Sequence, residues 1–208
     1  MGARTKSSQD WLKRHFADPY VQKSWEDGWR SRAAYKLLDM QEKYKFLKKG
    51  MCIVDLGAAP GSWSEVAKKF IGRNGKIIAM DLLPMEPIEG VMFLQADFTQ
   101  DKALSDLLEL TNNDNLDFIL CDISPNMSGD KIIDQPRIIY ILELVLEFAV
   151  KSLQSNAGML LKAFHGSGLE EFKKTLREHF KKVQFCKPKA SRNKSREIYI
   201  LATGFLGN

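Results

Sequence analysis

The stretch that constrains this chain most strongly is residues 51–66. It reads Met-Cys-Ile-Val-Asp-Leu-Gly-Ala-Ala-Pro-Gly-Ser-Trp-Ser-Glu-Val. An apolar run ends at Asp55, and a turn rich in small residues follows it. Ser62 or Ser64 is then placed to cap a helix. The stretch therefore predicts a strand, a tight loop and a helix, a unit in which a ligand approaches the backbone at the helix N-terminus.

The loop of this unit differs from the dinucleotide-binding fingerprint. Residues 57–61 read Gly-Ala-Ala-Pro-Gly, without the G-x-G-x-x-G spacing. Because Pro60 has no N–H and a fixed φ, the loop is stiff and offers few donors to a pyrophosphate. The loop therefore favours a nucleoside with a small charged tail, which is a first indication of S-adenosylmethionine.

Length and composition limit the remaining choices. The 208 residues suffice for one α/β domain with an extension. We find no apolar run of membrane-spanning length and no signal peptide, so we expect a soluble, cytoplasmic protein. The three cysteines, Cys52, Cys121 and Cys186, are far apart in the chain. They indicate buried free thiols in a reducing compartment, and no Cys/His cluster predicts a metal site.

The hydrophobic pattern alternates between strands and helices, which predicts an α/β fold with a doubly wound, mostly parallel sheet of seven strands and helices on both faces. The last two strands have no helix between them, so we expect an antiparallel hairpin at one edge. The predicted strands are residues 51–56, 76–82, 91–96, 116–123, 158–164, 183–186 and 198–202. The predicted helices are residues 33–44, 64–71, 101–110, 134–153 and 169–180. Residues 1–45 are predicted to be a basic tail with helices, and residues 46–208 the main domain.

The charge is unevenly distributed along the chain. Residues 1–50 carry a net charge of +6, residues 51–161 of −8, and residues 162–208 of +7. A single basic run is usually just a solvated face. Two basic ends around an acidic middle favour a surface that meets a phosphate backbone.

Several predicted strands end in ionisable residues: Asp55, Asp81, Asp97, Asp122 and Lys162. Each one alone is typical of a cap or turn, but together they indicate a ligand site at the carboxyl edge of the sheet. Asp81 lies 20 residues after Gly61, the distance at which an acidic residue accepts hydrogen bonds from ribose hydroxyls. Asp97, one strand over, is expected near an adenine edge.

A second group of ionisable residues combines Asp122 and Lys162, which would be neighbours across the mouth of the sheet. A structural ion pair explains these two residues equally well. Glu197, before the last strand, and Lys36, in the basic N-terminal helix, would complete a Lys-Asp-Lys-Glu cluster.

Six segments make the chain resemble the FtsJ family of ribose 2′-O-methyltransferases, in order and from about Trp11 to Gly204. The segments are Arg30-Ser31-Arg32-Ala33-Ala34-Tyr35-Lys36-Leu37, Asp55-Leu56-Gly57-Ala58-Ala59-Pro60-Gly61-Ser62-Trp63-Ser64, Asp81-Leu82-Leu83-Pro84-Met85, Phe93-Leu94-Gln95-Ala96-Asp97-Phe98, Asp122-Ile123-Ser124-Pro125-Asn126-Met127-Ser128-Gly129 and Ser195-Arg196-Glu197-Ile198-Tyr199. Ser62 and His165 depart from the family pattern, where a second Gly and a Gln are expected.

The resemblance implies a Rossmann-like, S-adenosylmethionine-dependent methyltransferase fold over residues 46–208. It implies cofactor contacts by Gly61, Trp63, Asp81, Asp97 and Asp122. It also implies a catalytic tetrad of Lys36, Asp122, Lys162 and Glu197. The implied substrate is ribosomal RNA, a uridine of 23S rRNA within the large ribosomal subunit; tRNA or another RNA is the alternative.

The residue types in the tetrad suit methyl transfer to a ribose hydroxyl, which needs in-line attack and stabilisation of developing charge. Lys162 is hypothesised to accept or relay the proton. Asp122 and Glu197 would favour its charged form, whereas Lys36 would disfavour it. Which effect wins decides whether Lys162 is a base or a cationic steering group.

The basic ends are predicted to line an RNA-binding groove beside the tetrad, with Arg32, Lys189, Arg192 and Arg196 as its main contacts. The other basic residues assigned to it are Arg4, Lys6, Lys13, Arg14, Arg30, Lys187 and Lys194. We expect a monomer. Two other classes stay open: a nicotinamide-dependent oxidoreductase on a similar sheet, and a non-catalytic RNA-binding or ribosome-assembly factor.

Overall fold

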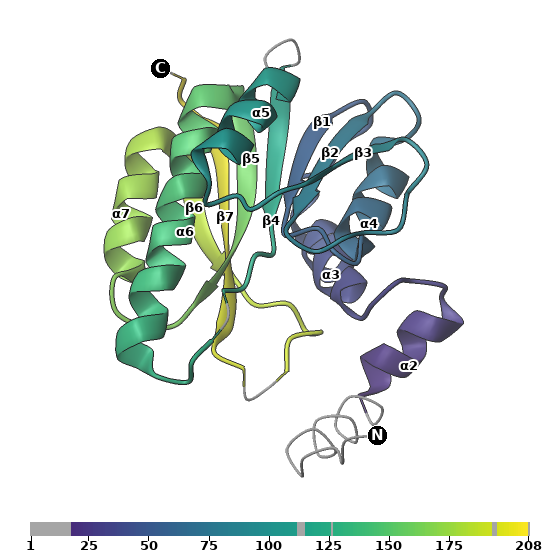
Figure 1. The fold of residues 1–208 in the computed structure, drawn as a ribbon, viewed down its shortest axis with the longest axis horizontal. Helices are drawn as coiled ribbons and strands as arrows, with labels where there is room; N and C mark the ends of the chain where they lie inside the picture. The colour runs from purple at the N-terminus through teal and green to yellow at the C-terminus, as the bar shows by residue number, and fades with distance from the viewer. Residues whose placement is uncertain (1–17, 112–114, 126, 193–194, 208) are drawn as a thin grey trace.

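A computed structural model describes residues 18–111, 115–125, 127–192 and 195–207. The first 17 residues of the predicted basic tail with helices (residues 1–45) lie outside these ranges. A seven-stranded sheet in the order β3-β2-β1-β4-β5-β7-β6 forms the centre of the protein (Figure 1). Its strands are β1 (Cys52–Leu56), β2 (Lys76–Asp81), β3 (Val91–Gln95), β4 (Leu116–Cys121), β5 (Leu153–Phe164), β6 (Phe180–Cys186) and β7 (Glu197–Phe205).

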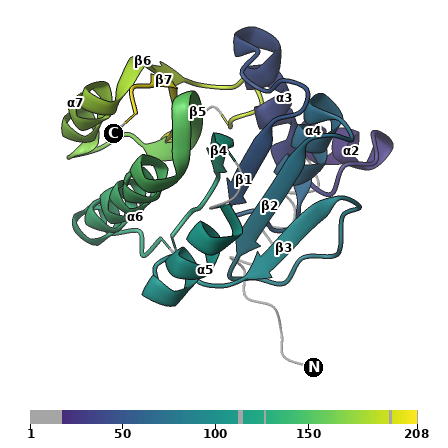
Figure 2. The ribbon, with the colours of Figure 1, turned by 90° about the horizontal axis from the view of Figure 1, so that it is seen from above.

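Helices cover both faces of the sheet, as the view from above shows (Figure 2). α5, α6 and α7 lie on one face, and α3 and α4 on the other, while α2 lies beyond α3 (Figure 1). The helices are α2 (Pro19–Glu26), α3 (Ala33–Tyr44), α4 (Ser62–Ile71), α5 (Asp101–Thr111), α6 (Lys131–Ser152) and α7 (Leu169–His179). This arrangement confirms the predicted α/β fold.

The first five strands run parallel, and β7 runs antiparallel to both of its neighbours, β5 and β6. The antiparallel edge predicted from the sequence is confirmed. In its register Lys162 lies opposite Tyr199, and Phe164 lies opposite Glu197. Because directly opposed residues share a face of the sheet, Lys162 and Tyr199 point to the same side.

Each face of the sheet has its own apolar core. The larger core joins β-strand residues such as Val54 and Ile119 to α6 and α7 through Phe148 and Phe172. The second core joins α3, through Leu37 and its neighbours, to α4, β1 and β7. α3 thus packs against the sheet as part of the second core, and the domain division between residues 45 and 46 remains a prediction.

Two helix starts differ from those predicted. α4 begins two residues earlier than predicted, at Ser62, because Gly61 in the left-handed region (φ 110°) is its N-cap. α6 begins at Lys131, because the side chain of Asp130 accepts a hydrogen bond from the N–H of Ile132. The helix therefore starts three residues before the predicted residue 134, and Pro136 lies inside it.

The three cysteines are buried, as expected, and form no disulfide among the residues that the structure describes. Among the described residues, no helix combines the length and apolar character that crossing a membrane requires.

Candidate active site

The loop between β1 and α4 is held at the carboxyl edge of the sheet by backbone contacts. The N–H groups of Gly57 and Ala58 both donate to the carbonyl of Met80, at 2.9 and 3.1 Å. Gly57 has φ of +75°, and a Cβ built there would lie 2.7 Å from the backbone N of Ile123. The close approach of the two loops therefore requires glycine at this position.

Asp55, the acidic residue of β1, is completely buried. Its Oδ2 accepts a hydrogen bond from Ser64 at 2.6 Å, while its Oδ1 has no hydrogen-bond partner among the described residues. Burial raises the pKa of Asp55 to about 7, and the nearby carboxylates of Asp122 and Asp81 raise it as well. The site is thus rich in negative charge and holds an unsatisfied acceptor.

This raised pKa predicts how stability depends on pH. The folded protein binds a proton on Asp55 more tightly than the unfolded chain does. The contribution of this proton to the free energy of unfolding is therefore fully present below about pH 4 and is lost as pH rises through about 7. Asp55→Asn should remove this loss, so its stability relative to the wild type should rise by up to about 1.4 kcal/mol per pH unit in that window. Urea unfolding of both proteins from pH 4 to 8 measures it, and parallel stability curves would contradict it.

The two other carboxylates predicted to contact the cofactor lie on neighbouring strands. Asp81 ends β2 and accepts hydrogen bonds from the N–H groups of Ala59 and Leu83, at 2.9 and 2.8 Å. Asp97 follows β3 and accepts hydrogen bonds from the N–H and hydroxyl of Thr99, which hold the pKa of its carboxyl below the usual range. Asp81 thus connects the second strand to the loop after the first.

The side chain of Trp63, a residue that the resemblance assigns to the cofactor, is turned into the protein. The indole is buried, its N–H donates to the carbonyl of Ala33 at 2.9 Å, and its ring packs 5.7 Å from that of Tyr199. Trp63 is the second residue of α4, where a backbone N–H has no acceptor within the helix. Only its main chain is therefore available to a ligand.

The loop fits a cationic nucleoside ligand. Three carboxylates, those of Asp55, Asp81 and Asp122, lie close enough to interact electrostatically, and one buried carboxylate oxygen lacks a donor. Such a site repels the pyrophosphate of a dinucleotide and attracts a positive charge. At Gly61, a Cβ would meet Ile88 and Met85 at 2.7 and 3.0 Å, so the loop packs tightly there as well.

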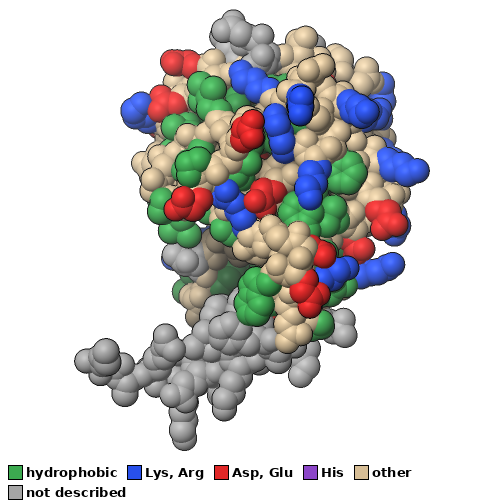
Figure 3. All heavy atoms as spheres, turned by 90° about the vertical axis from the view of Figure 1, so that its right-hand side faces the viewer, with side chains coloured by type: hydrophobic (Ala, Val, Ile, Leu, Met, Phe, Trp, Pro, Cys, Tyr) green, Lys and Arg blue, Asp and Glu red, His purple; other side chains and the backbone are tan. Residues whose placement is uncertain are grey.

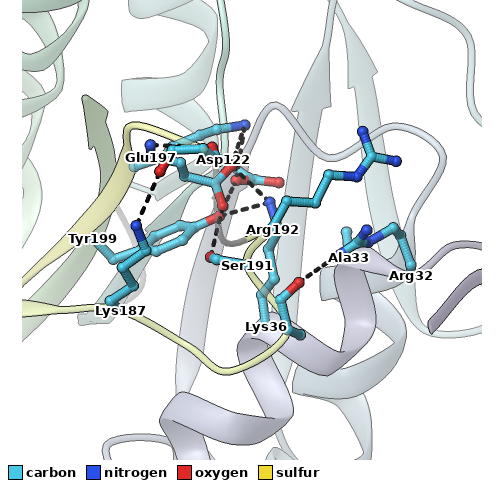
Figure 4. Close-up of polar contacts among 12 residues, drawn as sticks. Arg32, Ala33, Lys36, Asp122, Lys187, Ser191, Arg192, Glu197 and Tyr199 are labelled. Atoms are coloured by element: carbon cyan, nitrogen blue, oxygen red, sulfur yellow. Dashed lines mark hydrogen bonds and ion pairs between the residues drawn. The ribbon is translucent and has the colours of Figure 1, made fainter. Parts of the chain in front are cut away.

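The four residues of the predicted tetrad come together beside this loop. Lys36 Nζ donates to Glu197 Oε2 at 2.7 Å, and Lys162 Nζ lies 3.6 Å from the same oxygen. Lys162 Nζ also lies 3.3 Å from Asp122 Oδ1. Figure 4 shows the side chains of Lys36, Asp122 and Glu197 converging. Residues from α3 and from the ends of β4, β5 and β7 thus form one buried network.

The charges of this network are mutually stabilised. Burial alone would lower the pKa of Lys162, but Asp122 and Glu197 outweigh it and hold the pKa above its ordinary value. Burial alone would raise the pKa of Glu197, but Lys36 and Lys162 outweigh it and hold the pKa below its ordinary value. Lys162 is therefore an ammonium ion at neutral pH in the free protein.

Two further residues belong to this network and were missed in the sequence. The Tyr199 hydroxyl donates to Asp122 Oδ1 at 2.8 Å, and Lys36 Nζ donates to the Tyr199 oxygen at 3.3 Å. Ser191 Oγ donates to Glu197 Oε1 at 2.9 Å. The two-residue period of β7 could have indicated Tyr199, because it shares a strand face with Glu197. No local pattern indicated Ser191.

The four residues predicted to contact RNA lie near the network but differ in accessibility. Arg32 is largely buried and donates to the carboxylate of Asp18 and the carbonyl of Ala190. Arg192 is 53% exposed and also contacts Asp18, at 3.2 Å. Lys189 and Arg196 are exposed, and Arg196 donates to the carbonyl of His165.

Of the other basic residues assigned to the groove, Arg30 is engaged within the protein. Its guanidinium donates to Glu65 and to the carbonyls of Pro60, Glu86 and Pro87. The side view in Figure 3 shows Lys and Arg side chains interspersed with acidic and apolar ones. The positions Arg4, Lys6, Lys13, Arg14 and Lys194 lie outside the described residues.

Comparisons with known proteins point to one family. Residues 29–205 match the model of the FtsJ-like methyltransferase family. The chain is 49% identical over 205 residues to ribosomal RNA large subunit methyltransferase E of Pseudomonas aeruginosa. The aligned residues cover 99% of each of the two chains. It is 47% identical to the protein of that name from Pseudomonas fluorescens, covering 99% of this chain and 98% of the relative.

A solved structure described as a ribosomal RNA methyltransferase, from Plasmodium falciparum, superposes with a TM-score of 0.77. It is 33% identical and covers 86% of this chain and 100% of its own. With its family segments, its network of lysines and carboxylates, and these matches, the chain belongs to the FtsJ-like methyltransferase family.

Proposed function

We propose that this protein transfers a methyl group from S-adenosylmethionine to a ribose 2′-hydroxyl of ribosomal RNA, in a uridine of 23S rRNA of the large ribosomal subunit. The observation that carries the proposal is the buried network of Lys36, Asp122, Lys162 and Glu197 beside a carboxylate-rich nucleoside site. The names of the relatives, which specify large-subunit ribosomal RNA, support the choice of substrate. We place the protein in the cytoplasm, as a monomer.

The cofactor proposal rests on the charge and shape of the loop. S-adenosylmethionine, when bound, supplies a methyl group activated by its sulfonium. Asp81 and Asp97 would hold the ribose and the adenine, and Asp122 would lie beside the methionine end. Gly61 and the main chain of Trp63 would line the loop. The unpaired oxygen of Asp55 supports a cationic ligand, since a donor or a positive charge would satisfy it.

For the chemistry, we propose that Lys162 acts as a steering cation. The paired carboxylates keep it charged, so in the free protein it has no lone pair with which to accept a proton. Its ammonium would donate a hydrogen bond to the ribose oxygen and stabilise the negative charge that develops there as the O–H proton passes to solvent water, the O–CH3 bond forms and the S–CH3 bond breaks. Asp122 and Glu197 would hold the ammonium in place, and Lys36 would share Glu197 with it.

A methyl-transfer assay tests the proposed function. Purified protein with labelled S-adenosylmethionine should transfer label to large ribosomal subunits or to free 23S rRNA isolated from cells lacking the enzyme. Label in tRNA alone would favour the alternative substrate. Binding of RNA without any transfer of label would favour a non-catalytic ribosome-assembly factor and contradict the proposal.

The RNA surface is proposed to include the exposed residues Lys189, Arg192 and Arg196, which lie in or next to the segment leading into β7. Removing one phosphate contact, as in Lys189→Ala, should lower the slope of log affinity against log salt by about 0.7 to 0.9. Lys182→Ala, an exposed lysine near the start of β6, is the matched control and should leave the slope unchanged. Equal slopes for both variants, measured by filter binding at several salt concentrations, would place the groove elsewhere.

A further inference from the structure

Ser191 is a buried serine that contacts the tetrad but is not one of its four residues. Its Oγ donates to Glu197 Oε1 at 2.9 Å, while Glu197 Oε2 accepts from Lys36 at 2.7 Å and lies 3.6 Å from Lys162. We infer that Ser191 is a positioning residue, which orients the Glu197 carboxylate so that one oxygen serves both lysines. This inference rests on the proposed methyl transfer and adds to it a residue that acts through Glu197.

Ser191 can act in this way because its own position is held by the N-terminal helices. Its N–H donates to the carbonyl of Pro188 at 3.0 Å in a tight turn. The preceding carbonyl, of Ala190, accepts from Arg32, whose guanidinium also donates to Asp18, the N-cap of α2. Figure 4 shows Ser191 and Arg192 between β7 and the start of α3, beside Arg32.

These contacts form a latch, defined here as Asp18, Arg32, Ala190 and Arg192. Arg192 Nε reaches the same oxygen of Asp18 at 3.2 Å, so two guanidinium groups share one carboxylate. Ala190 and Ser191 are buried, with 1% and 6% of their surfaces exposed. The latch therefore fixes the segment before β7, and Ser191 carries that constraint to Glu197.

The orientation of Glu197 matters because a carboxylate rotates readily about its terminal torsion. Without the Ser191 hydroxyl, Oε1 loses its donor in a buried place and competes with Oε2 for the ammonium groups. Lys162 would then be less well held relative to the ribose oxygen. Loss of one buried hydrogen bond to a charged group corresponds to about a 10-fold to 100-fold loss of rate.

A second consequence concerns the pH dependence of the rate. The Ser191 hydroxyl is one of the groups that hold the pKa of Glu197 low, so Ser191→Ala should raise it. The acidic limb of the profile of kcat against pH should then move to higher pH. The charged or titratable groups around Glu197 are Lys36 and Arg32 at α3, Lys162 on β5, Asp122 at the end of β4, and Tyr199 on β7.

The test compares Ser191→Ala with the wild type and with Ser105→Ala, a matched control at an exposed serine of α5. Ser191→Ala should lower kcat about 10-fold to 100-fold, shift the acidic limb to higher pH, and leave the KM for S-adenosylmethionine and the RNA affinity unchanged. Ser105→Ala should match the wild type in every measurement. An unchanged kcat in Ser191→Ala, or an unmoved acidic limb, would overturn the inference.

Two additions keep the result interpretable. Asp18→Asn weakens the latch, keeps an N-cap for α2 and removes no group in contact with Glu197, so it should give the same change in kcat and in pH profile; a wild-type profile would overturn the role of the latch. If the wild type itself transfers no methyl group, the proposed function fails. Titration of the Glu197 carboxyl by carbon-13 NMR then still tests Ser191, because an identical titration in Ser191→Ala would overturn the inference.

Discussion

Lys162→Ala should lower the rate of methyl transfer by at least about 10³-fold, because it removes the charge that steers the acceptor oxygen and stabilises developing negative charge there. The affinity for S-adenosylmethionine should stay nearly intact, since Lys162 lies at the end of β5, in the tetrad rather than in the loop before α4. Single-turnover kinetics with labelled cofactor and a separate cofactor titration measure the two effects.

The folded state of this variant needs its own check. Removing the ammonium leaves the carboxylates of Asp122 and Glu197 with less compensation in a buried place, which costs stability. Circular dichroism at the assay temperature establishes that the variant is folded. Lys151→Ala, at an exposed ion pair with Glu147 near the end of α6, is the control and should retain full activity. Loss of cofactor binding in a folded Lys162→Ala protein would show that Lys162 serves the cofactor site instead.

Gly57→Ala should destabilise the protein and also reduce its activity. A methyl group there would lie 2.7 Å from the backbone N and 2.9 Å from the Cα of Ile123, and φ at Gly57 is +75°. The strained φ and the clash together should cost about 3 kcal/mol, or about 6 to 12 °C in Tm. Because Ile123 follows Asp122, relief of the clash would displace a member of the tetrad.

Gly28→Ala separates the cost of the strained φ from the cost of the clash with Ile123. Gly28 has φ of +73°, and a methyl group there would meet no described residue within 4 Å other than the chain neighbours of Gly28. Its cost should therefore be only that of the strained φ, about 1 kcal/mol. Thermal unfolding of both variants by calorimetry provides the comparison. If the two variants lose the same stability, the contact of the loop with Ile123 is not what requires glycine at position 57.

The strands, the mostly parallel sheet and its antiparallel edge could be predicted from the local pattern, whereas the order of the strands was not predicted. The helix at Ala33–Tyr44 was placed at its observed bounds, because its apolar residues repeat at helical spacing. β5 and β7 proved longer than predicted, since their first or last residues lack the apolar character of the centre. A strand's ends are set by its pairing partners, and β7 pairs on both sides.

The part of the candidate site that consists of ionisable residues at the ends of strands could be predicted. The proximity of Asp122 and Lys162 follows from the topology alone, since neighbouring parallel strands end at the same edge of the sheet. Ser191 and the burial of Arg32 were not predictable, because their partners lie 6 and 158 residues away in the chain and depend on how a loop folds back. Arg32 is predicted to contact RNA because of its charge; in the structure its guanidinium donates to Asp18 and to the carbonyl of Ala190, and the RNA contact stays a prediction.

The most direct measurement is to identify the methylated nucleoside. Large ribosomal subunits from cells lacking the enzyme are incubated with the protein and labelled S-adenosylmethionine, and the rRNA is digested and separated by mass spectrometry. We predict label in 2′-O-methyluridine and its absence with Lys162→Ala. Label on a base, or no labelled nucleoside from a protein that binds both cofactor and subunit, would contradict ribose methylation by this network.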